Sequence, residues 1–223
     1  MFQVSERRVC RAMEKPRSIC LSAIDGLTLM HHFGQGKIKA EFDVNTATYD
    51  GDSTILSGIV VGDEKPEERM VIMGHRDHAI PPCANDNGSS LGCLLELARV
   101  LGHYIFRRSV EFICSTAEEG CSPGMAQYVQ MHKDRTNKVK AAINLDMFGT
   151  GGRLQLVESS KWHNSDTFEF SHWVIEALET AADDVYHHSI TDTPEMVDAN
   201  SLKALFDITA VAVMRIVNLE TLP

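Results

Sequence analysis

Short apolar segments that alternate with a helical pattern are the feature of this sequence that most restricts its fold. VIMGH (71–75), SVEFICST (109–116) and AAINLDMFG (141–149) have the composition of buried strands. Between the first two, apolar residues recur from Leu91 to Leu101 at the spacing of one helix face. Such helical connections join parallel strands and cover the faces of the sheet. We therefore expect an α/β fold of three layers, α/β/α, around a mixed, largely parallel central sheet.

The segments before and after this core complete the expected order of elements. Alternation over residues 37–62 predicts two antiparallel strands with a turn at Asp50–Asp52, and EKPEER (64–69) predicts a charged loop. Asp198 or Asn200 is expected to cap the last helix of the chain. The remaining elements are expected as helices over 125–132, 168–182 and 202–217 and as a strand over 153–159.

The length of the chain predicts one domain over residues 37–223, preceded by an irregular lead-in over residues 1–36 that is part helix. A chain of this size buries roughly 70% of its unfolded surface, so its core does not require a structural metal. A bound metal would therefore be expected to take part in catalysis.

The six cysteines form no CxxC pair and resemble buried free thiols, which favours a reducing compartment. Because we also find no signal peptide, we expect a cytoplasmic protein, or a secreted one if the chain is a truncated form.

The charge of the chain restricts its partners. The formal net charge is −10 at pH 7, and an acidic surface repels phosphate backbones and anionic lipid headgroups. No apolar run approaches eighteen residues, the length that a membrane-spanning helix requires. We therefore expect neither nucleic acid nor a membrane as a partner, whereas the oligomeric state cannot be predicted.

Polar side chains follow each predicted buried strand, and one more precedes the helix of residues 91–101. Because the carboxyl ends of parallel strands meet at one edge of a sheet, these side chains should converge. Imidazoles and carboxylates without thiolates are typical of hydrolytic zinc sites, and several carboxylates suit two ions bridged by one of them. The residues concerned are His75, Asp77, Asp86, Glu118, Glu119 and Asp146.

These segments resemble, in order, the motifs of the M28 zinc aminopeptidases. The resemblance covers residues 37–158 and implies the zinc-exopeptidase fold, two zinc ions and a peptide or aminoacyl substrate. Near the end of the chain, YHHSITDTPEMVD (186–198) resembles the closing His-Thr-x-x-Asp-Thr stretch of the family, with serine in place of threonine. The other matching motifs are GHRDH (74–78), ANDNGSSLGCLLELARVL (84–101), RSVEFICSTAEEG (108–120) and AAINLDMFG (141–149).

The resemblance implies a role for each matching residue. Glu118 would be the general base, and Asp77 would orient a metal-bound imidazole by accepting its other N–H. The peptide bond between Asp86 and Asn87 would be cis. The implied zinc ligands are His75 and Asp146 for one ion, Glu119 and His188 for the other, and Asp86 as the bridge between them.

Three neighbouring residues are left out of this ligand set. His78 and His187 are out of register with the motifs, and we interpret both as exposed loop histidines. Cys83 precedes Asp86 by three residues and is interpreted as a packing thiol. Exposed histidines and buried thiols of this kind are common in proteins without any metal.

The sequence departs from the family in two places. Only 42 positions separate Asp146 from His188, and a turn and a strand that help to form the substrate pocket in the family are not found there. The segment around residues 22–42 resembles the tail of an inserted protease-associated domain, so residues 1–36 read as its remnant. We therefore expect a trimmed family member with an open pocket.

Two alternatives to an aminopeptidase remain open. A non-catalytic relative could keep the fold without the activity, although it would have no physical reason to keep so many costly polar groups together. A single-zinc enzyme of the glutaminyl-cyclase type is disfavoured by His75 and the Glu118–Glu119 pair. The side-chain preference of the enzyme cannot be predicted from the sequence.

Overall fold

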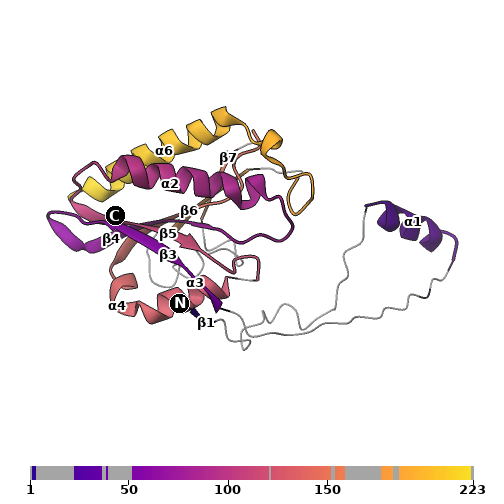
Figure 1. Cartoon of the computed structure of the whole chain (residues 1–223), viewed down its shortest axis with the longest axis horizontal. Coiled ribbons are helices and arrows are strands. Elements are labelled where there is room, and N and C mark those ends of the chain that lie inside the picture. Colours follow the sequence, from indigo (N-terminus) through magenta and orange to yellow (C-terminus); the bar gives the residue numbers. More distant parts are fainter. Residues whose placement is uncertain are drawn as a thin grey trace. The chain divides into compact units, whose positions relative to one another are not determined.

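The computed structural model describes residues 2–3, 23–36, 39, 52–120, 122–151, 154–158, 177–182 and 186–221 (Figure 1). The chain divides into two units, Ser5–Gly51 and the combination of Met1–Val4 with Asp52–Pro223. The described part of the smaller unit is helix α1 (Ala23–Phe33) with the turn after it. The boundary of a lead-in at residue 36, and its origin as a domain remnant, stay predictions.

A six-stranded mixed sheet forms the centre of the larger unit, which confirms the predicted architecture. Its four inner strands β5, β4, β6 and β8 are parallel, and β3 and β7 run antiparallel to them at the two edges. A separate short pair joins β1 (Phe2–Gln3) to β2 (Asp52–Ser53). The order across the sheet is β3 (Leu56–Val60), β5 (Arg108–Ser115), β4 (Lys65–His75), β6 (Val139–Leu145), β8 (Ala177–Ala182) and β7 (Leu154–Glu158).

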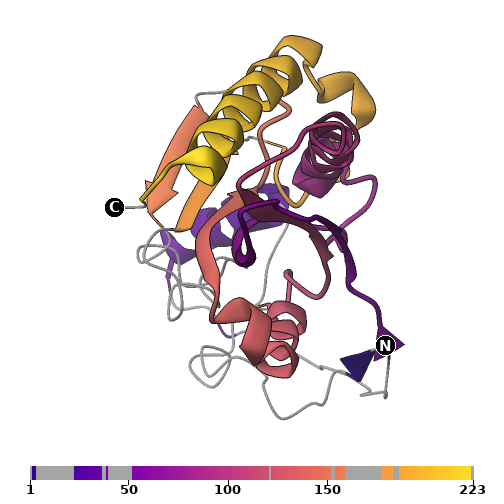
Figure 2. The same cartoon turned by 90° about the vertical axis from the view of Figure 1, so that its left-hand side faces the viewer.

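Helices cover both faces of this sheet, as Figure 2 shows. On one face lie α2 (Ser90–Leu101) and α6 (Ala199–Asn218), and on the other α3 (Pro123–Met131) and α4 (Lys133–Thr136). The alternation of strand side chains divides the core accordingly. In β4, Met70 and Ile72 face the core beneath α2 and α6, whereas Val71 and Met73 face the core beneath α3.

The predicted start of the last helix is confirmed. Asp198 is the N-cap of α6, because its carboxylate accepts the backbone N–H of Ser201 at 2.9 Å. The same carboxylate accepts the Ser201 hydroxyl at 2.8 Å. Such a cap satisfies donors that the first helical turn leaves unpaired.

The helix predicted over residues 168–182 is wrong where the structure describes it. Residues 177–182 form strand β8, and residues 168–176 lie outside the described part. The segment ALETAA consists of good helix formers, but it pairs with β6 on one side and β7 on the other. Pairing along both edges of a strand outweighs helix propensity, which is a weak preference of a few tenths of a kcal/mol per residue.

The charged loop predicted over residues 64–69 is also wrong, because β4 begins at Lys65. The charges of this segment meet opposite charges on the neighbouring strand β5. Glu68 accepts a hydrogen bond from Arg108 Nε at 2.5 Å, and Arg69 donates to Glu111 at 3.2 Å. A run of charges can therefore belong to a strand when the adjacent strand pairs with it.

Of the two strands predicted over residues 37–62, the second lies in β2 and β3. The described partner of β3 is β5, and the two pair antiparallel from Leu56↔Cys114 to Val60↔Val110. The first predicted strand lies outside the described residues, apart from Lys39.

Glu111 is a buried acid on β5, on the face of the sheet covered by α3. Its carboxylate accepts the hydroxyl of Tyr128 at 2.6 Å and meets Arg69 at 3.2 Å and Arg135 at 3.9 Å. Burial, followed by the contact with Glu111, raises the pKa of Tyr128 to about 12. This network joins β4, β5, α3 and α4 through one carboxylate.

Glu111→Ala is expected to lower the free energy of unfolding by about 3 kcal/mol, because it removes the acceptor of the buried Tyr128 hydroxyl and the partner of Arg69, whose side chain is only 15% exposed. Urea unfolding followed by circular dichroism measures this. Glu96→Ala is the control, since Glu96 pairs with Arg99 on the solvent side of α2 and should matter little. If both substitutions lowered the free energy of unfolding equally, the buried contacts of Glu111 would not contribute more to stability than an exposed ion pair.

Candidate metal centre

The polar side chains predicted to converge do lie together at the carboxyl ends of the parallel strands. His75 is the last residue of β4, and Asp146 follows the last residue of β6. Glu118 and Glu119 lie in the loop after β5. Asp86 lies in the segment Ala84–Ser89 that leads into α2, at a kink where the backbone of Asp86 and Asn87 is not helical. The strand order β5-β4-β6 thus brings distant parts of the sequence to one place.

The first donor cluster consists of His75, Asp86 and Asp146. The Nε2 atom of His75 lies 3.3 Å from Asp86 Oδ1 and 3.5 Å from Asp146 Oδ1. His75 is only 1% exposed. Asp146 Oδ1 is buried and has no hydrogen-bond partner among the described residues. A buried carboxylate oxygen without a hydrogen bond is costly unless a cation meets it.

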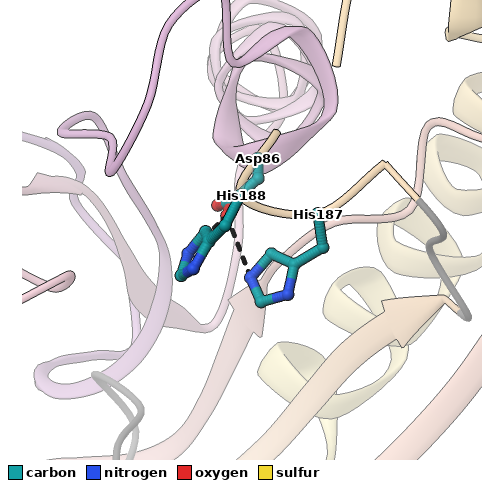
Figure 3. Close-up of side chains that lie close together, drawn as sticks. All are labelled: Asp86, His187 and His188. Atoms are coloured by element: carbon teal, nitrogen blue, oxygen red, sulfur yellow. Dashed lines mark ion pairs between the residues drawn. The ribbon is translucent and has the colours of Figure 1, made fainter. Parts of the chain in front are cut away.

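The second donor cluster uses the other oxygen of Asp86. Asp86 Oδ2 lies 3.2 Å from Nε2 of His188 and 3.2 Å from Nε2 of His187 (Figure 3). His188 Nε2 also lies 2.9 Å from Glu119 Oε2. Asp86 therefore contributes one oxygen to each cluster, the arrangement that a bridging carboxylate has.

Asp77 holds the loop that carries the two glutamates. Its carboxylate oxygens accept the backbone N–H groups of Glu118 and Glu119, each at 3.2 Å. His75 Nδ1 lies 3.1 Å from the backbone carbonyl oxygen of Asp77 and 3.7 Å from its carboxylate. The carbonyl and the carboxylate of Asp77 thus both lie on the Nδ1 side of the imidazole, and the carboxylate also fixes the glutamate loop.

Asp192 and Asn87 hold the backbone around Asp86. The carboxylate of Asp192 accepts the N–H of Asn85 at 2.7 Å and of Asp86 at 3.0 Å. Asn87 donates to the carbonyl of Leu145 at 3.1 Å and accepts from Met147 N–H at 3.3 Å, so it joins this turn to the end of β6. The peptide bond between Asp86 and Asn87 is cis, as the resemblance implied.

The electrostatics of the cluster favour a cation. Burial lowers the pKa of His75, but the Asp146, Asp77 and Asp86 carboxylates outweigh it and raise that pKa. Burial raises the pKa of Asp86, but His187 and His75 outweigh it and hold that pKa well below its usual range. Burial and the charge of Asp86 raise the pKa of Glu119. Concentrated carboxylates of this kind attract a divalent ion.

The donor separations and donor types fit zinc. Two ligand atoms at about 2.0–2.1 Å from a tetrahedral zinc ion lie roughly 3.3 Å apart. The imidazole–carboxylate pairs described above lie between 2.9 and 3.5 Å apart, and the donor atoms of each triad, His75–Asp86–Asp146 and Asp86–His187–His188, lie within 4.8 Å of one another. The nearby thiol of Cys83 is buried, its pKa is raised by that burial, and it donates to the carbonyl of Ile80 at 2.9 Å. Cys83 is thus placed as a packing thiol.

His78 and His187 were both interpreted as exposed loop histidines, but the structure gives them different surroundings. His78 is exposed and belongs to neither described cluster. His187 is 43% exposed on its side chain, yet its Nε2 atom faces Asp86. The hydrogen bond with Asp86 raises its pKa. The sequence offered one signal for it, its position next to His188.

Comparisons with known proteins identify the family of this chain. A family described as Peptidase family M28 matches residues 56–178. Aminopeptidase YwaD of Bacillus subtilis is 30% identical over 142 residues, which are 60% of this chain and 30% of that protein. Leucine aminopeptidase 2 of Trichophyton equinum is 29% identical over 135 residues, 58% of this chain and 26% of that protein. The chain thus spans about a third or less of these two relatives.

Solved structures show the same fold. An aminopeptidase from Aneurinibacillus sp. strain AM-1 superposes with a TM-score of 0.67 at 22% identity, over 90% of this chain and 57% of that one. BSAP, a zinc aminopeptidase from Bacillus subtilis, superposes with a TM-score of 0.66 at 22% identity, over 74% of this chain and 50% of that one.

Proposed function

The chain belongs to peptidase family M28, and on that premise we propose that it is a zinc-dependent aminopeptidase, an exopeptidase that hydrolyses N-terminal peptide bonds. This proposal rests mainly on the two donor clusters on either side of Asp86, which lie at the carboxyl ends of parallel strands. The names of the relatives, which include aminopeptidases and a zinc aminopeptidase, support the same class of reaction.

We assign two zinc ions to the chain. His75, Asp86 and Asp146 would hold one ion, and Asp86, Glu119 and His188 the other, with Asp86 as the bridge. When bound, the ions would polarise the peptide carbonyl and lower the pKa of water. The oxygen of Asp146 that lacks a hydrogen-bond partner among the described residues supports this assignment, because a cation would satisfy it.

Glu118 would be the general base of the reaction. A carboxylate in this position takes a proton from the attacking water and then gives it to the leaving amine. Asp77 supports this role, since its contacts with the N–H groups of both glutamates fix the loop beside the strand end. Glu119 points its oxygens to His188 and to the N–H of Ala79, at 2.9 and 2.7 Å, so the two neighbours have different tasks.

The two alternatives fit these contacts less well. A non-catalytic protein would gain nothing from a buried cluster of carboxylates and imidazoles, which costs free energy without a ligand. A single-zinc cyclase would need one cluster only, whereas donors meet both oxygens of Asp86. The open substrate pocket and its peptide or aminoacyl ligand stay proposals, as most of residues 159–185 lie outside the described part.

The protein purified without chelator is expected to hold two zinc ions per chain after dialysis against micromolar zinc. Elemental analysis measures the ratio. Zinc should also raise the melting temperature, because only the folded chain brings the ligands together. His78→Ala is the control and should keep both ions. A ratio near zero would contradict the proposal, and a ratio near one would favour the single-zinc alternative.

A cytoplasmic location is proposed on the state of the thiols. The described cysteines Cys83, Cys93 and Cys114 are free, which is typical of a reducing compartment. Among the helices that the structure describes, none has the length and apolar character to cross a membrane.

A further inference from the structure

His187 lies where a metal ligand would lie, although the resemblance gives it no role. Its Nε2 atom and that of His188 are both 3.2 Å from the same oxygen, Asp86 Oδ2. The two rings are side by side, with centroids 3.8 Å apart (Figure 3). Their side chains are almost equally exposed, at 43% and 44%. Position relative to Asp86 therefore does not distinguish the two histidines.

The backbone explains why consecutive residues reach one carboxylate. In an extended chain, neighbouring side chains point to opposite sides. Here Ser189 N–H donates to the carbonyl of Tyr186 at 3.1 Å, so His187 and His188 are the middle residues of a turn. His188 has a left-handed backbone with φ of 52°, which is uncommon outside glycine. The Ser189 hydroxyl, 2.6 Å from the same carbonyl, holds this turn closed.

We propose that His187 is a fourth protein ligand of the zinc ion at Asp86 Oδ2, beside His188 and Glu119. The proposal rests on the proposed function, since it requires that the chain bind zinc. The donor atoms of Asp86, His187 and His188 lie within 4.8 Å of one another, and both histidine distances to Asp86 match the roughly 3.3 Å between ligands of a tetrahedral ion.

This ligand count makes the two metal positions unequal. The ion at Asp86 Oδ2 would have four protein ligands, the number that closes a tetrahedral zinc site. The ion beside His75 would have three protein ligands, His75, Asp86 and Asp146, the number that leaves a position for solvent or substrate. The open coordination position therefore belongs to the ion beside His75.

The test is zinc titration of the full chain against a competing chelator, with the visible spectrum of the cobalt-loaded protein as a second readout. H187Q keeps the size of the side chain and removes the imidazole, and H187D offers a carboxylate ligand. We expect H187Q to weaken one of two zinc affinities at least tenfold and to change the cobalt absorption of that site. H187D should recover part of the affinity, and the control H78A should match the wild type.

Three results would overturn the proposal. Wild-type affinities and spectrum in H187Q would show that His187 is only a surface partner of Asp86. A weakened affinity with an unchanged cobalt spectrum would mean that His187 acts through its hydrogen bond to Asp86 without touching the ion. If the wild-type chain binds no zinc, the proposed function fails first. Circular dichroism of each variant, which changes an exposed turn residue, verifies folding.

Discussion

Glu118→Gln is expected to lower kcat for an aminoacyl amide by about 10²–10⁴-fold, the range that a general base contributes. The substitution keeps the shape of the side chain and removes its ability to take a proton. Both zinc ions should remain, because Glu118 belongs to neither donor cluster of the described residues. Steady-state kinetics and elemental analysis of the same preparation measure the two quantities.

Glu119→Gln is the matched control, one residue along the same loop. Glu119 Oε2 lies 2.9 Å from His188 Nε2, so this change should weaken one zinc site and leave the base in place. Excess zinc should then recover part of the activity of Glu119→Gln and none of that of Glu118→Gln. An equal loss of metal in both variants would mean that the two roles are assigned wrongly.

The fold was predictable where local pattern and tertiary structure agree. Strands β5 and β6 and the second half of β4 are largely apolar, and α2 has one apolar face, so each could be found from its own residues, whereas the charged first half of β4 could not. Strand β8 could not, since ALETAA favours a helix and becomes a strand only between β6 and β7. The secondary structure of such a segment is determined by pairing with strands that lie far away in the sequence.

The site was predictable through topology. Once three parallel strands were expected, the residues after their carboxyl ends had to meet, and His75 and Asp146 do. The position of His187 was not predictable, because it depends on the left-handed backbone of His188, which residue type alone does not require. The Asp77 carboxylate lies 3.7 Å from His75 Nδ1, and it also accepts two backbone N–H groups, which the sequence did not predict.

Asp86→Asn is expected to remove both zinc ions together and with them the activity. Asp86 Oδ1 lies 3.3 Å from His75, and Oδ2 lies 3.2 Å from His188, so each oxygen serves one cluster. The amide has a similar shape but lacks the negative charge that holds two cations near each other. We expect fewer than one ion per chain after the dialysis that leaves two on the wild type, measured by elemental analysis.

Asp146→Asn tests whether Asp86 is a bridging ligand, because Asp146 is proposed to bind only one of the two ions. Asp146 meets His75 but no histidine of the second cluster, so its substitution should remove one ion and keep the other. Zinc should raise the melting temperature of the wild type most, of Asp146→Asn less and of Asp86→Asn least, because each bound ion stabilises only the folded chain. If Asp86→Asn lost a single ion, its carboxylate would serve one zinc, and the clusters on its two sides would be independent sites.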